Sequence, residues 1–382
     1  MTPKTYLIQQ TSHKKAKSTK KINFEQEIEY CHGCLIGTTV CPVFQSYGDR
    51  AAYTNAGVGI IMGAYHTEKW GLKPPESFIQ STYECTNCGA CELVCGHSLD
   101  VVDLITYIRG TLVERGLVPK TIQEALKNTF KHGNPWGRLQ NRRDQWTEQL
   151  NVKRFSNTSK HNVLLYVGCT SSYDTRCQEV ARSMVAVLNK AGINYGILGN
   201  EEKCCGDQIL RMGEKGLFEM LVEQNIDLFN KHGIRRIVTL SPHSYNTFKN
   251  DYPRLGGNYQ VQHYSQFLSE LIDEGKLRFS KRVDKVVTYH DPCFLCRHND
   301  VCEAPRRILE AIPGLKLVEM PRNRKDSFCC GGGGGRMWID EKSEERVSTI
   351  RAREAVSVNP DIVATACPFC LVNLEDGVKT LD

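Results

Sequence analysis

The sequence has no apolar run of about 18 residues, the length that a membrane-spanning helix needs. It also has no Gly-x-Gly-x-x-Gly fingerprint, and its run of five glycines lacks the Gly-Lys-Ser/Thr ending of a phosphate-binding loop. Its first residues do not show the pattern of a secretory leader. We therefore expect no direct membrane span, no Walker-type phosphate loop and no flavin on this chain.

Cysteine, in contrast, is abundant, with 18 in 382 residues. Together with the missing leader, this number favours a reducing cytoplasm, where thiols act as ligands rather than bridges. We expect a cytoplasmic protein that associates with a membrane only through partner subunits. The net charge of +6 comes partly from lysines among Ser, Thr and Gln in the first 21 residues. Because no aromatic residues or nucleic-acid module accompany them, we expect a flexible basic tail over 1–25 and no nucleic-acid partner.

Five cysteines in the last third of the chain form the most specific pattern. Cys293 follows Asp-Pro, Cys329 and Cys330 precede the five glycines, and Cys367 and Cys370 enclose Pro-Phe. Thiolates favour iron–sulfur clusters or zinc, but tetrahedral zinc uses only four ligands. An adjacent Cys-Cys pair does not easily serve one cubane cluster either, so the pattern favours a larger cluster over a zinc ribbon or a disulfide scaffold.

These stretches, with Tyr289-His290-Asp291-Pro292 and Arg336-Met337-Trp338 beside them, resemble the Cys-Cys-Gly domain of heterodisulfide reductase. The same domain occurs in iron–sulfur subunits of glycolate and glycerol-3-phosphate oxidising enzymes and in dissimilatory sulfite-reduction complexes. The resemblance implies that the five cysteines hold a non-cubane 4Fe-4S cluster and act as the catalytic residues. His290, Arg297 and Arg336 are candidates for groups that surround this cluster or steer a substrate, with structural salt bridges as the alternative for the two arginines.

A second cysteine pattern lies near the amino terminus. Cys85-x2-Cys88-x2-Cys91-x3-Cys95 has the full spacing of a bacterial-type ferredoxin motif, in which the fourth cysteine binds the other cluster of a pair. Zinc is the alternative occupant, although zinc sites usually show paired Cys-x2-Cys units. We therefore expect a helical ferredoxin-like domain that carries cubane clusters.

The partner motif upstream is incomplete, because Gly37 stands where its third cysteine would be. By the crossing rule, a complete 4Fe-4S cluster is expected at Cys41, Cys85, Cys88 and Cys91. A second site is left with Cys31, Cys34 and Cys95. It could hold a 3Fe-4S cluster, hold a 4Fe-4S cluster completed by water or His32, or remain empty.

From Val163 onward, short β-rich runs alternate with helical stretches, which predicts α/β units. Strands are expected at 163–167, 195–198 and 236–240, and again at 286–289, 315–319 and 361–364. The cysteine-bearing positions repeat at intervals of about 125 residues: Cys169 matches Cys293, Cys204-Cys205 matches Cys329-Cys330, and Ser241-Pro-His-Ser244 matches Cys367-Pro-Phe-Cys370. We therefore expect an α/β carboxyl-terminal half made of two Cys-Cys-Gly repeats with short parallel-rich sheets, related by a pseudo-twofold axis.

The expected divisions are the tail (1–25), a mainly α-helical ferredoxin-like domain (26–137), a linker (138–161), a degenerate repeat (162–284) and a complete repeat (285–382). In the degenerate repeat, Ser241 and Ser244 replace two cysteines, and a hydroxyl is a poor iron ligand. Cys169, Cys204 and Cys205 are then relict thiols or ligands of a smaller cluster. Three further cysteines are expected to be buried thiols: Cys177, Cys296 and Cys302.

The function expected from these patterns is that of an iron–sulfur oxidoreductase subunit. Heterodisulfide reductase, as the resemblance implies, splits its disulfide between two non-cubane clusters, whereas this chain offers one. We therefore expect it to pass single electrons between the ferredoxin-type clusters and that one cluster, with a flavin-containing subunit as partner. Other iron–sulfur or membrane subunits could complete the complex. The alternatives are a disulfide or persulfide reductase at the single cluster and, from another class, a zinc-stabilised nucleic-acid-binding module.

Overall fold

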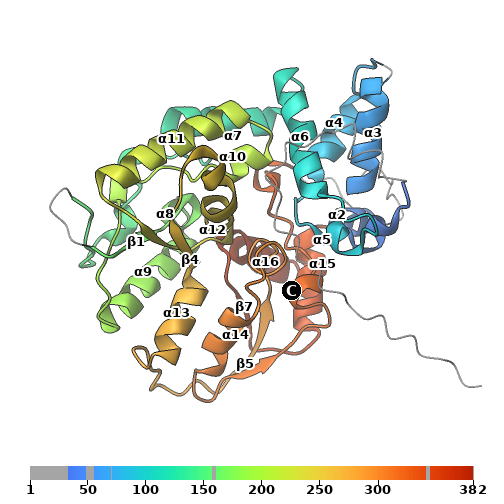
Figure 1. The fold of residues 1–382 in the computed structure, drawn as a ribbon. Coiled ribbons are helices and arrows are strands. Elements are labelled where there is room, and N and C mark those ends of the chain that lie inside the picture. The colour runs from blue at the N-terminus through green and yellow to red at the C-terminus, as the bar shows by residue number, and fades with distance from the viewer. Residues whose placement is uncertain (1–32, 49–55, 70, 157–160, 341–344, 382) are drawn as a thin grey trace, which may run out of the picture.

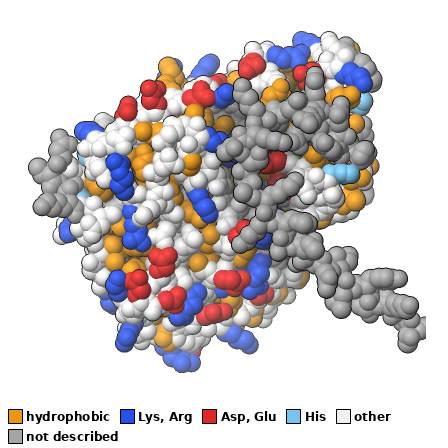
Figure 2. All heavy atoms as spheres, viewed as in Figure 1, with side chains coloured by type: hydrophobic (Ala, Val, Ile, Leu, Met, Phe, Trp, Pro, Cys, Tyr) orange, Lys and Arg blue, Asp and Glu red, His pale blue; other side chains and the backbone are white. Residues whose placement is uncertain are grey.

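The computed structural model describes residues 33–48, 56–69, 71–156, 161–340 and 345–381. The tail expected over 1–25, and Cys31 and His32 of the first cysteine motif, lie outside the described residues. Helices from the amino-terminal part stand beside a larger unit that contains two sheets and their helices (Figure 1). Among the described helices, none combines the length and apolar character that crossing a bilayer requires. On the face shown in Figure 2, acidic and basic side chains lie interspersed over the larger unit, with hydrophobic ones scattered between them.

The amino-terminal part is helical, as expected for a ferredoxin-like domain. Helix α6 begins after Asp100, whose carboxylate accepts a hydrogen bond from the N–H of Asp103, and it buries one apolar face against α3 and α4. The helices of this part are η1 (Ile36–Val40), α2 (Pro42–Ser46), α3 (Gly57–Lys69), α4 (Glu76–Glu84), α5 (Ala90–Val94), α6 (Val101–Glu114) and α7 (Lys120–His132).

Each half of the remaining chain contains one parallel sheet. The strand order is β2-β1-β3-β4 in the first half and β6-β5-β7 in the second, so that β1 and β5 are central. The strands are β1 (Val163–Tyr166), β2 (Tyr195–Gly196), β3 (Arg236–Thr239), β4 (Gln260–His263), β5 (Val286–His290), β6 (Lys316–Val318) and β7 (Ile362–Thr365). Because parallel strands end at one edge of a sheet, the residues that follow β5 and β7 meet there, and so do those that follow β1 and β3.

The helices of the first half are α8 (Cys169–Tyr173), α9 (Thr175–Lys190), η6 (Gly199–Glu201), α10 (Asp207–Arg211), α11 (Lys215–Lys231), α12 (Pro242–Asn246), η7 (Thr247–Asp251), η8 (Tyr252–Leu255) and α13 (Tyr264–Asp273). Those of the second half are α14 (Glu303–Glu310), η9 (Arg324–Asp326), η10 (Arg336–Trp338), α15 (Val347–Val356) and α16 (Pro368–Lys379). The order strand, helix, strand, helix, strand is therefore shared by both halves, as predicted. Strand β4 and helix α13 extend the first half and were not expected.

The contacts between the halves are reciprocal, as a twofold relation requires. Helix α8, which follows β1, packs on α16, which follows β7. The equivalent segment after β5 contacts α12: the rings of Phe294 and His243 lie 4.3 Å apart, and the Asn299 side chain donates to Asn246 Oδ1. The ends of both sheets therefore face one another across the interface.

The segment expected as a linker packs on the first half over its described part, 138–156. It contains η4 (Gln140–Arg142) and η5 (Gln145–Thr147), and both Arg143 and Trp146 are buried. Arg154 pairs with Ile197 as an isolated parallel bridge, so the segment covers the edge of the sheet at β2. The segment is therefore packed on the domain rather than free in solvent, and its polar side chains belong to its outward face.

Arg109 of α6 is fully buried where the amino-terminal helices meet both halves. Its guanidinium donates to the carbonyl oxygens of Cys85 (2.7 Å), Arg211 (2.8 Å) and Gly334 (2.8 Å). Because buried carbonyls without a donor are costly, this one side chain stabilises the position of three segments that are far apart in sequence.

The glycine run lies against the backbone of the ferredoxin motif. A Cβ atom on Gly333 would lie 2.4 Å from the Thr86 carbonyl oxygen, and one on Gly334 would lie 2.5 Å from that of Cys85. Gly331 donates its N–H to Cys329 Sγ at 3.3 Å, and the N–H of Gly332 donates to Cys330. The run therefore allows the close approach of two cysteine-bearing loops and also places N–H groups beside the Cys-Cys pair.

We expect Gly333→Ala to destabilise the protein by about 1–3 kcal/mol, because backbone atoms cannot yield to the added methyl group. The matched control is Gly216→Ala on the exposed face of α11, where the new Cβ would meet only the Glu214 side chain, at 3.5 Å. This control should raise stability by up to about 1 kcal/mol. The measurement is thermal unfolding of protein purified without oxygen. Equal melting temperatures for Gly333→Ala and the wild type would contradict the tight approach.

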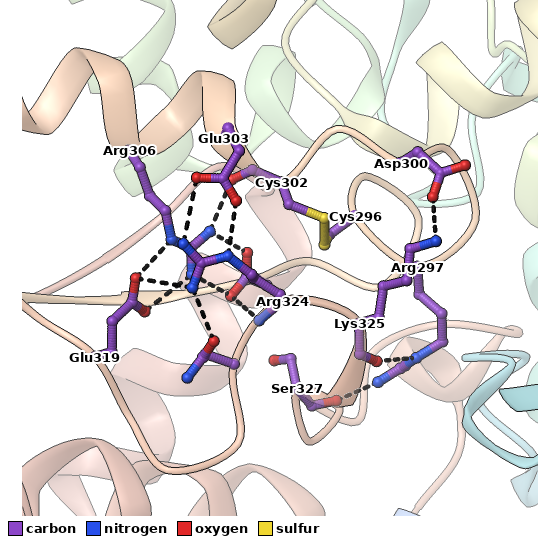
Figure 3. Close-up of a disulfide and its surroundings, with 12 residues drawn as sticks. Cys296, Arg297, Asp300, Cys302, Glu303, Arg306, Glu319, Arg324, Lys325 and Ser327 are labelled. Carbon is purple, nitrogen blue, oxygen red and sulfur yellow. Dashed lines mark hydrogen bonds and ion pairs between the residues drawn. A yellow bond between two sulfur atoms is a disulfide. The ribbon is translucent and has the colours of Figure 1, made fainter. Parts of the chain in front are cut away.

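Cys296 and Cys302 form a disulfide, which corrects the expectation that both are thiols (Figure 3). The chain folds back after Cys293, and a backbone hydrogen bond from Val301 to Leu295 brings the two cysteines together. A spacing of six residues alone does not indicate this turn. The disulfide closes the loop that carries Arg297, whose guanidinium donates to the Lys325 and Ser327 carbonyls.

In the wild type, we expect a mild thiol reductant to lower the free energy of unfolding by about 2 kcal/mol, the chain-entropy effect of opening so short a loop. Cys302→Ser should show the same loss of stability without reductant, and adding the reductant should not lower its stability further. Cys177→Ser removes a buried thiol outside the loop and should respond to the reductant as the wild type does. The measurement is urea unfolding without oxygen. Free thiols at both Cys296 and Cys302 in the untreated protein would contradict the disulfide.

Candidate metal centres

Four cysteines of the amino-terminal part line one pocket. Cys85 and Cys88 come from the loop between α4 and α5, Cys91 lies in the first turn of α5, and Cys41 precedes α2. The rest of the wall is largely apolar and includes Val101 and Ile105 of α6. The four are those that the crossing rule groups together: Cys41, Cys85, Cys88 and Cys91.

Burial raises the pKa of the Cys41 thiol to about 12, and it raises the pKa of Cys91 well above its usual value. The neighbouring thiols add to both shifts, because thiolates so close together repel one another. Such a group can be ionised only with a cation among the sulfurs. Four thiols that converge in an apolar pocket therefore fit an iron–sulfur cluster as donors.

The second site of the ferredoxin-like domain is described only in part. Cys34 is exposed just before η1, and Cys95 is partly buried at the end of α5, which packs on η1. Cys31 lies outside the described residues. The three-cysteine site stays a prediction.

The five carboxyl-terminal cysteines come together from three segments. Cys293 follows β5, Cys329 and Cys330 follow η9, and Cys367 and Cys370 lie at the start of α16. All are buried except Cys293, which is partly exposed. Side-chain hydrogen bonds link them in a continuous chain, from Cys293 through the adjacent pair to Cys370 and Cys367.

The pKa values of these five thiols are shifted in different directions. A hydrogen bond from Cys329 lowers the pKa of the Cys330 thiol well below its usual value, whereas burial raises the pKa of Cys370. Buried thiolates without a counter-cation are costly. Five thiols within mutual reach exceed what one zinc ion uses and fit a larger iron–sulfur centre as donors.

The two groups of cysteines touch through Cys88 and Cys329. The hydrogen bond that these side chains share raises the pKa of Cys88 well above its usual value. Arg297 fixes the contact, since its guanidinium donates to the carbonyls of Cys88 (3.0 Å) and Ser327. Arg336 likewise donates to the Glu84 carbonyl (2.9 Å). Both arginines therefore donate to backbone carbonyl oxygens and hold the two cysteine loops together.

Two histidines lie beside the carboxyl-terminal group. A ring nitrogen of His290, at the end of β5, lies within 4.8 Å of the sulfurs of Cys330 and Cys370. His243, from the first half, interacts with Cys367, while its Nδ1 lies 2.9 Å from Asp207 Oδ2. His290 was a candidate from its place in the motif. His243 was not a candidate from the sequence. It stands where the second copy has Phe369, and the first copy has serines in place of the flanking cysteines.

Arg143, from the segment that packs on the first half, lies beside the cysteines of the degenerate repeat. Both of its terminal nitrogens lie 3.6 Å from Cys169 Sγ, and Glu202 forms a buried ion pair with it at 2.8 Å. A hydrogen bond with Cys204 and the guanidinium lower the pKa of Cys169 to about 7. The hydroxyl of Ser244, at a cysteine's register position, donates to Cys205 Sγ at 3.3 Å.

A pocket separates this degenerate site from the second half. Its wall joins the three thiols to aromatic side chains of the amino-terminal part and of the second half: Trp136, Trp338 and Phe369. Both serines, Ser241 and Ser244, line it. The pocket therefore reaches the segment that carries Cys367 and Cys370.

Comparisons with known proteins agree with these features. Residues 163–249 and 287–375 each match a family model described as "Cysteine-rich domain", and 27–99 match a "4Fe-4S dicluster domain". The two cysteine-rich matches confirm the predicted duplication. Both kinds of domain support iron–sulfur clusters in this chain. No solved structure matches.

Among curated relatives, one subunit of the dihydromethanophenazine:CoB–CoM heterodisulfide reductase of Methanosarcina barkeri is 32% identical over 374 residues, which cover 93% of this chain and 90% of that protein. The EtfAB:quinone oxidoreductase of Syntrophomonas wolfei is 39% identical over 79% of this chain. The probable iron-sulfur-binding oxidoreductase FadF of Bacillus subtilis is 40% identical over 78%. The chain spans 44% of the length of each of these two. Given its ferredoxin-type motif, its duplicated cysteine-rich domain and its near full-length match to the Methanosarcina protein, the chain belongs to the heterodisulfide reductase family of iron–sulfur proteins.

Proposed function

We propose that this chain relays single electrons between ferredoxin-type clusters and one non-cubane cluster, as part of an oxidoreductase complex with a flavoprotein partner. The contact between Cys88 and Cys329 is the observation that carries this proposal. It brings a cysteine of the complete ferredoxin motif against one of the Cys-Cys-Gly motif. Such a contact leaves no protein layer between the two groups of thiols.

In this proposal, Cys41, Cys85, Cys88 and Cys91 hold a 4Fe-4S cubane, and Cys31, Cys34 and Cys95 hold a second cubane or a 3Fe-4S cluster. The five carboxyl-terminal cysteines hold the non-cubane cluster: Cys293, Cys329, Cys330, Cys367 and Cys370. When bound, these clusters supply one-electron redox chemistry. The residues around them exclude water, fix the distance between the two groups and donate hydrogen bonds to sulfur.

The proposed partner follows from what the chain lacks and from its relatives. A relative named as an EtfAB:quinone oxidoreductase and another named as part of a heterodisulfide reductase both work with further redox components by their names. A flavin on a partner protein would split electron pairs into the single electrons that iron–sulfur clusters carry. We keep the same domain bounds in this proposal: 26–137, 162–284 and 285–382. We also propose that the chain is cytoplasmic and associates with a membrane only through partner subunits.

A second candidate, a disulfide or persulfide reductase at the single cluster, is favoured by the pocket between the halves. The pocket reaches from Cys169 to Phe369, so a small sulfur compound could approach the Cys367 segment from it. Cleavage between two non-cubane clusters is not proposed, because Ser241 and Ser244 leave the first half without the thiolates for one. A change in the spectrum of the carboxyl-terminal cluster on adding small disulfides or persulfides would favour this candidate.

We expect protein purified without oxygen to contain at least about eight iron atoms per chain, four for the complete cubane and four for the non-cubane cluster. Cys370→Ser should lose about four of them and keep the spectrum of the cubane. Cys177→Ser, which removes a buried thiol outside both groups, should keep all. The measurement is iron and sulfide analysis with electron paramagnetic resonance (EPR).

Fewer than about eight irons in the wild type, or no loss of iron in Cys370→Ser, would contradict the proposed clusters. A colourless protein with stoichiometric zinc would instead support the zinc-binding alternative.

A further inference from the structure

His290, the last residue of β5, is 1% exposed, and its two ring nitrogens have different surroundings. Nδ1 accepts a hydrogen bond from the Nε–H of Arg351 at 3.0 Å. Nε2 is fully buried and has no hydrogen-bond partner among the described residues. A buried polar atom without a partner is unfavourable, which points to a group that the protein atoms alone do not supply.

Arg351 determines which nitrogen carries the proton. A guanidinium group donates hydrogen bonds and cannot accept them, so Nδ1 must present its lone pair. In neutral imidazole the proton then sits on Nε2. His290 therefore presents an N–H group on its unpartnered side.

Arg351 is itself held firmly, so the tautomer is fixed by the fold. It is fully buried in α15 and donates to Glu354 Oε2 at 2.7 Å. Further bonds run to the Arg322 carbonyl and to Ser327 Oγ, two residues before Cys329. These partners restrain the guanidinium from turning away from Nδ1.

The sulfurs of Cys330 and Cys370 lie close to this ring, since one His290 ring nitrogen is within 4.8 Å of both. These three side chains are close enough together to hold a metal ion, but Arg351 argues against His290 as a ligand. A metal-bound Nε2 would need its lone pair, and both nitrogens would then lack a proton. A buried imidazolate of this kind is not expected, so His290 is a donor rather than a ligand.

We propose that His290 Nε2–H donates a hydrogen bond to the cluster sulfur at the Cys330–Cys370 corner, and that Arg351 is the positioning residue that fixes this tautomer. The inference rests on the proposed non-cubane cluster and adds a residue that tunes it. Hydrogen bonds to cluster sulfur stabilise the more negative, reduced state and raise the reduction potential.

The test compares His290→Leu, which has no donor, with His290→Gln, whose amide can replace the Nε2–H. Both are made in the full chain, purified without oxygen and titrated for the midpoint potential of the carboxyl-terminal cluster. That signal is assigned by its absence in Cys370→Ser. We expect His290→Leu to keep the wild-type iron content and to shift the one-electron equilibrium about tenfold toward oxidation, a fall of about 59 mV. His290→Gln should stay near the wild type.

A second measurement on the wild type does not depend on a variant that folds. In the paramagnetic state of the cluster, we expect an exchangeable proton coupling that disappears in D₂O, and only a weak coupling from ¹⁵N-labelled histidine. A strong coupling from an iron-bound nitrogen would overturn the donor assignment. So would an unchanged potential in His290→Leu at full iron content. Wild-type protein without the carboxyl-terminal cluster would instead refute the proposed function, so the two failures are distinguishable.

Discussion

The close approach of two loops, one from each cysteine pattern, is the constraint on which the rest of this structure depends. Gly333 and Gly334 pass against the carbonyls of Thr86 and Cys85 at distances that a side chain would prevent. Arginines then secure the approach by binding backbone carbonyls: Arg109, Arg297 and Arg336. The contact between the Cys88 and Cys329 thiols is the result. Two groups of thiols that are far apart in sequence thereby become one continuous set of sulfurs.

The duplication explains how the second half of this set is assembled. In each copy, parallel strands end at one edge, and the positions of the cysteine repeat follow the strands. The first copy has Ser241 and Ser244 where the second has cysteines, yet its α12 packs against the second copy and contributes His243 beside Cys367. The degenerate copy thus remains a structural part of the carboxyl-terminal site, and the pocket between the copies borders both.

The sequence predicted those features that depend on local pattern. The ferredoxin motif predicted a helical amino-terminal domain, and the repeat of cysteine-bearing positions at about 125 residues predicted two like halves of alternating strands and helices. Strand β4 was missed because Gln-Val-Gln-His carries little apolar pattern, and its place beside β3 is set by pairing alone. The Cys296–Cys302 disulfide and the burial of Arg109 were missed for a related reason. Both depend on contacts between segments whose approach leaves no mark in the local sequence.

An iron anomalous-scattering map from crystals grown without oxygen would test the central claim most directly, because it locates each iron relative to its cysteines. The account predicts one iron centre bonded to Cys88 and a second bonded to Cys329, adjacent to each other, with none beside Ser241 and Ser244. An equivalent centre beside those serines, or Cys367 and Cys370 remote from any iron, would contradict it.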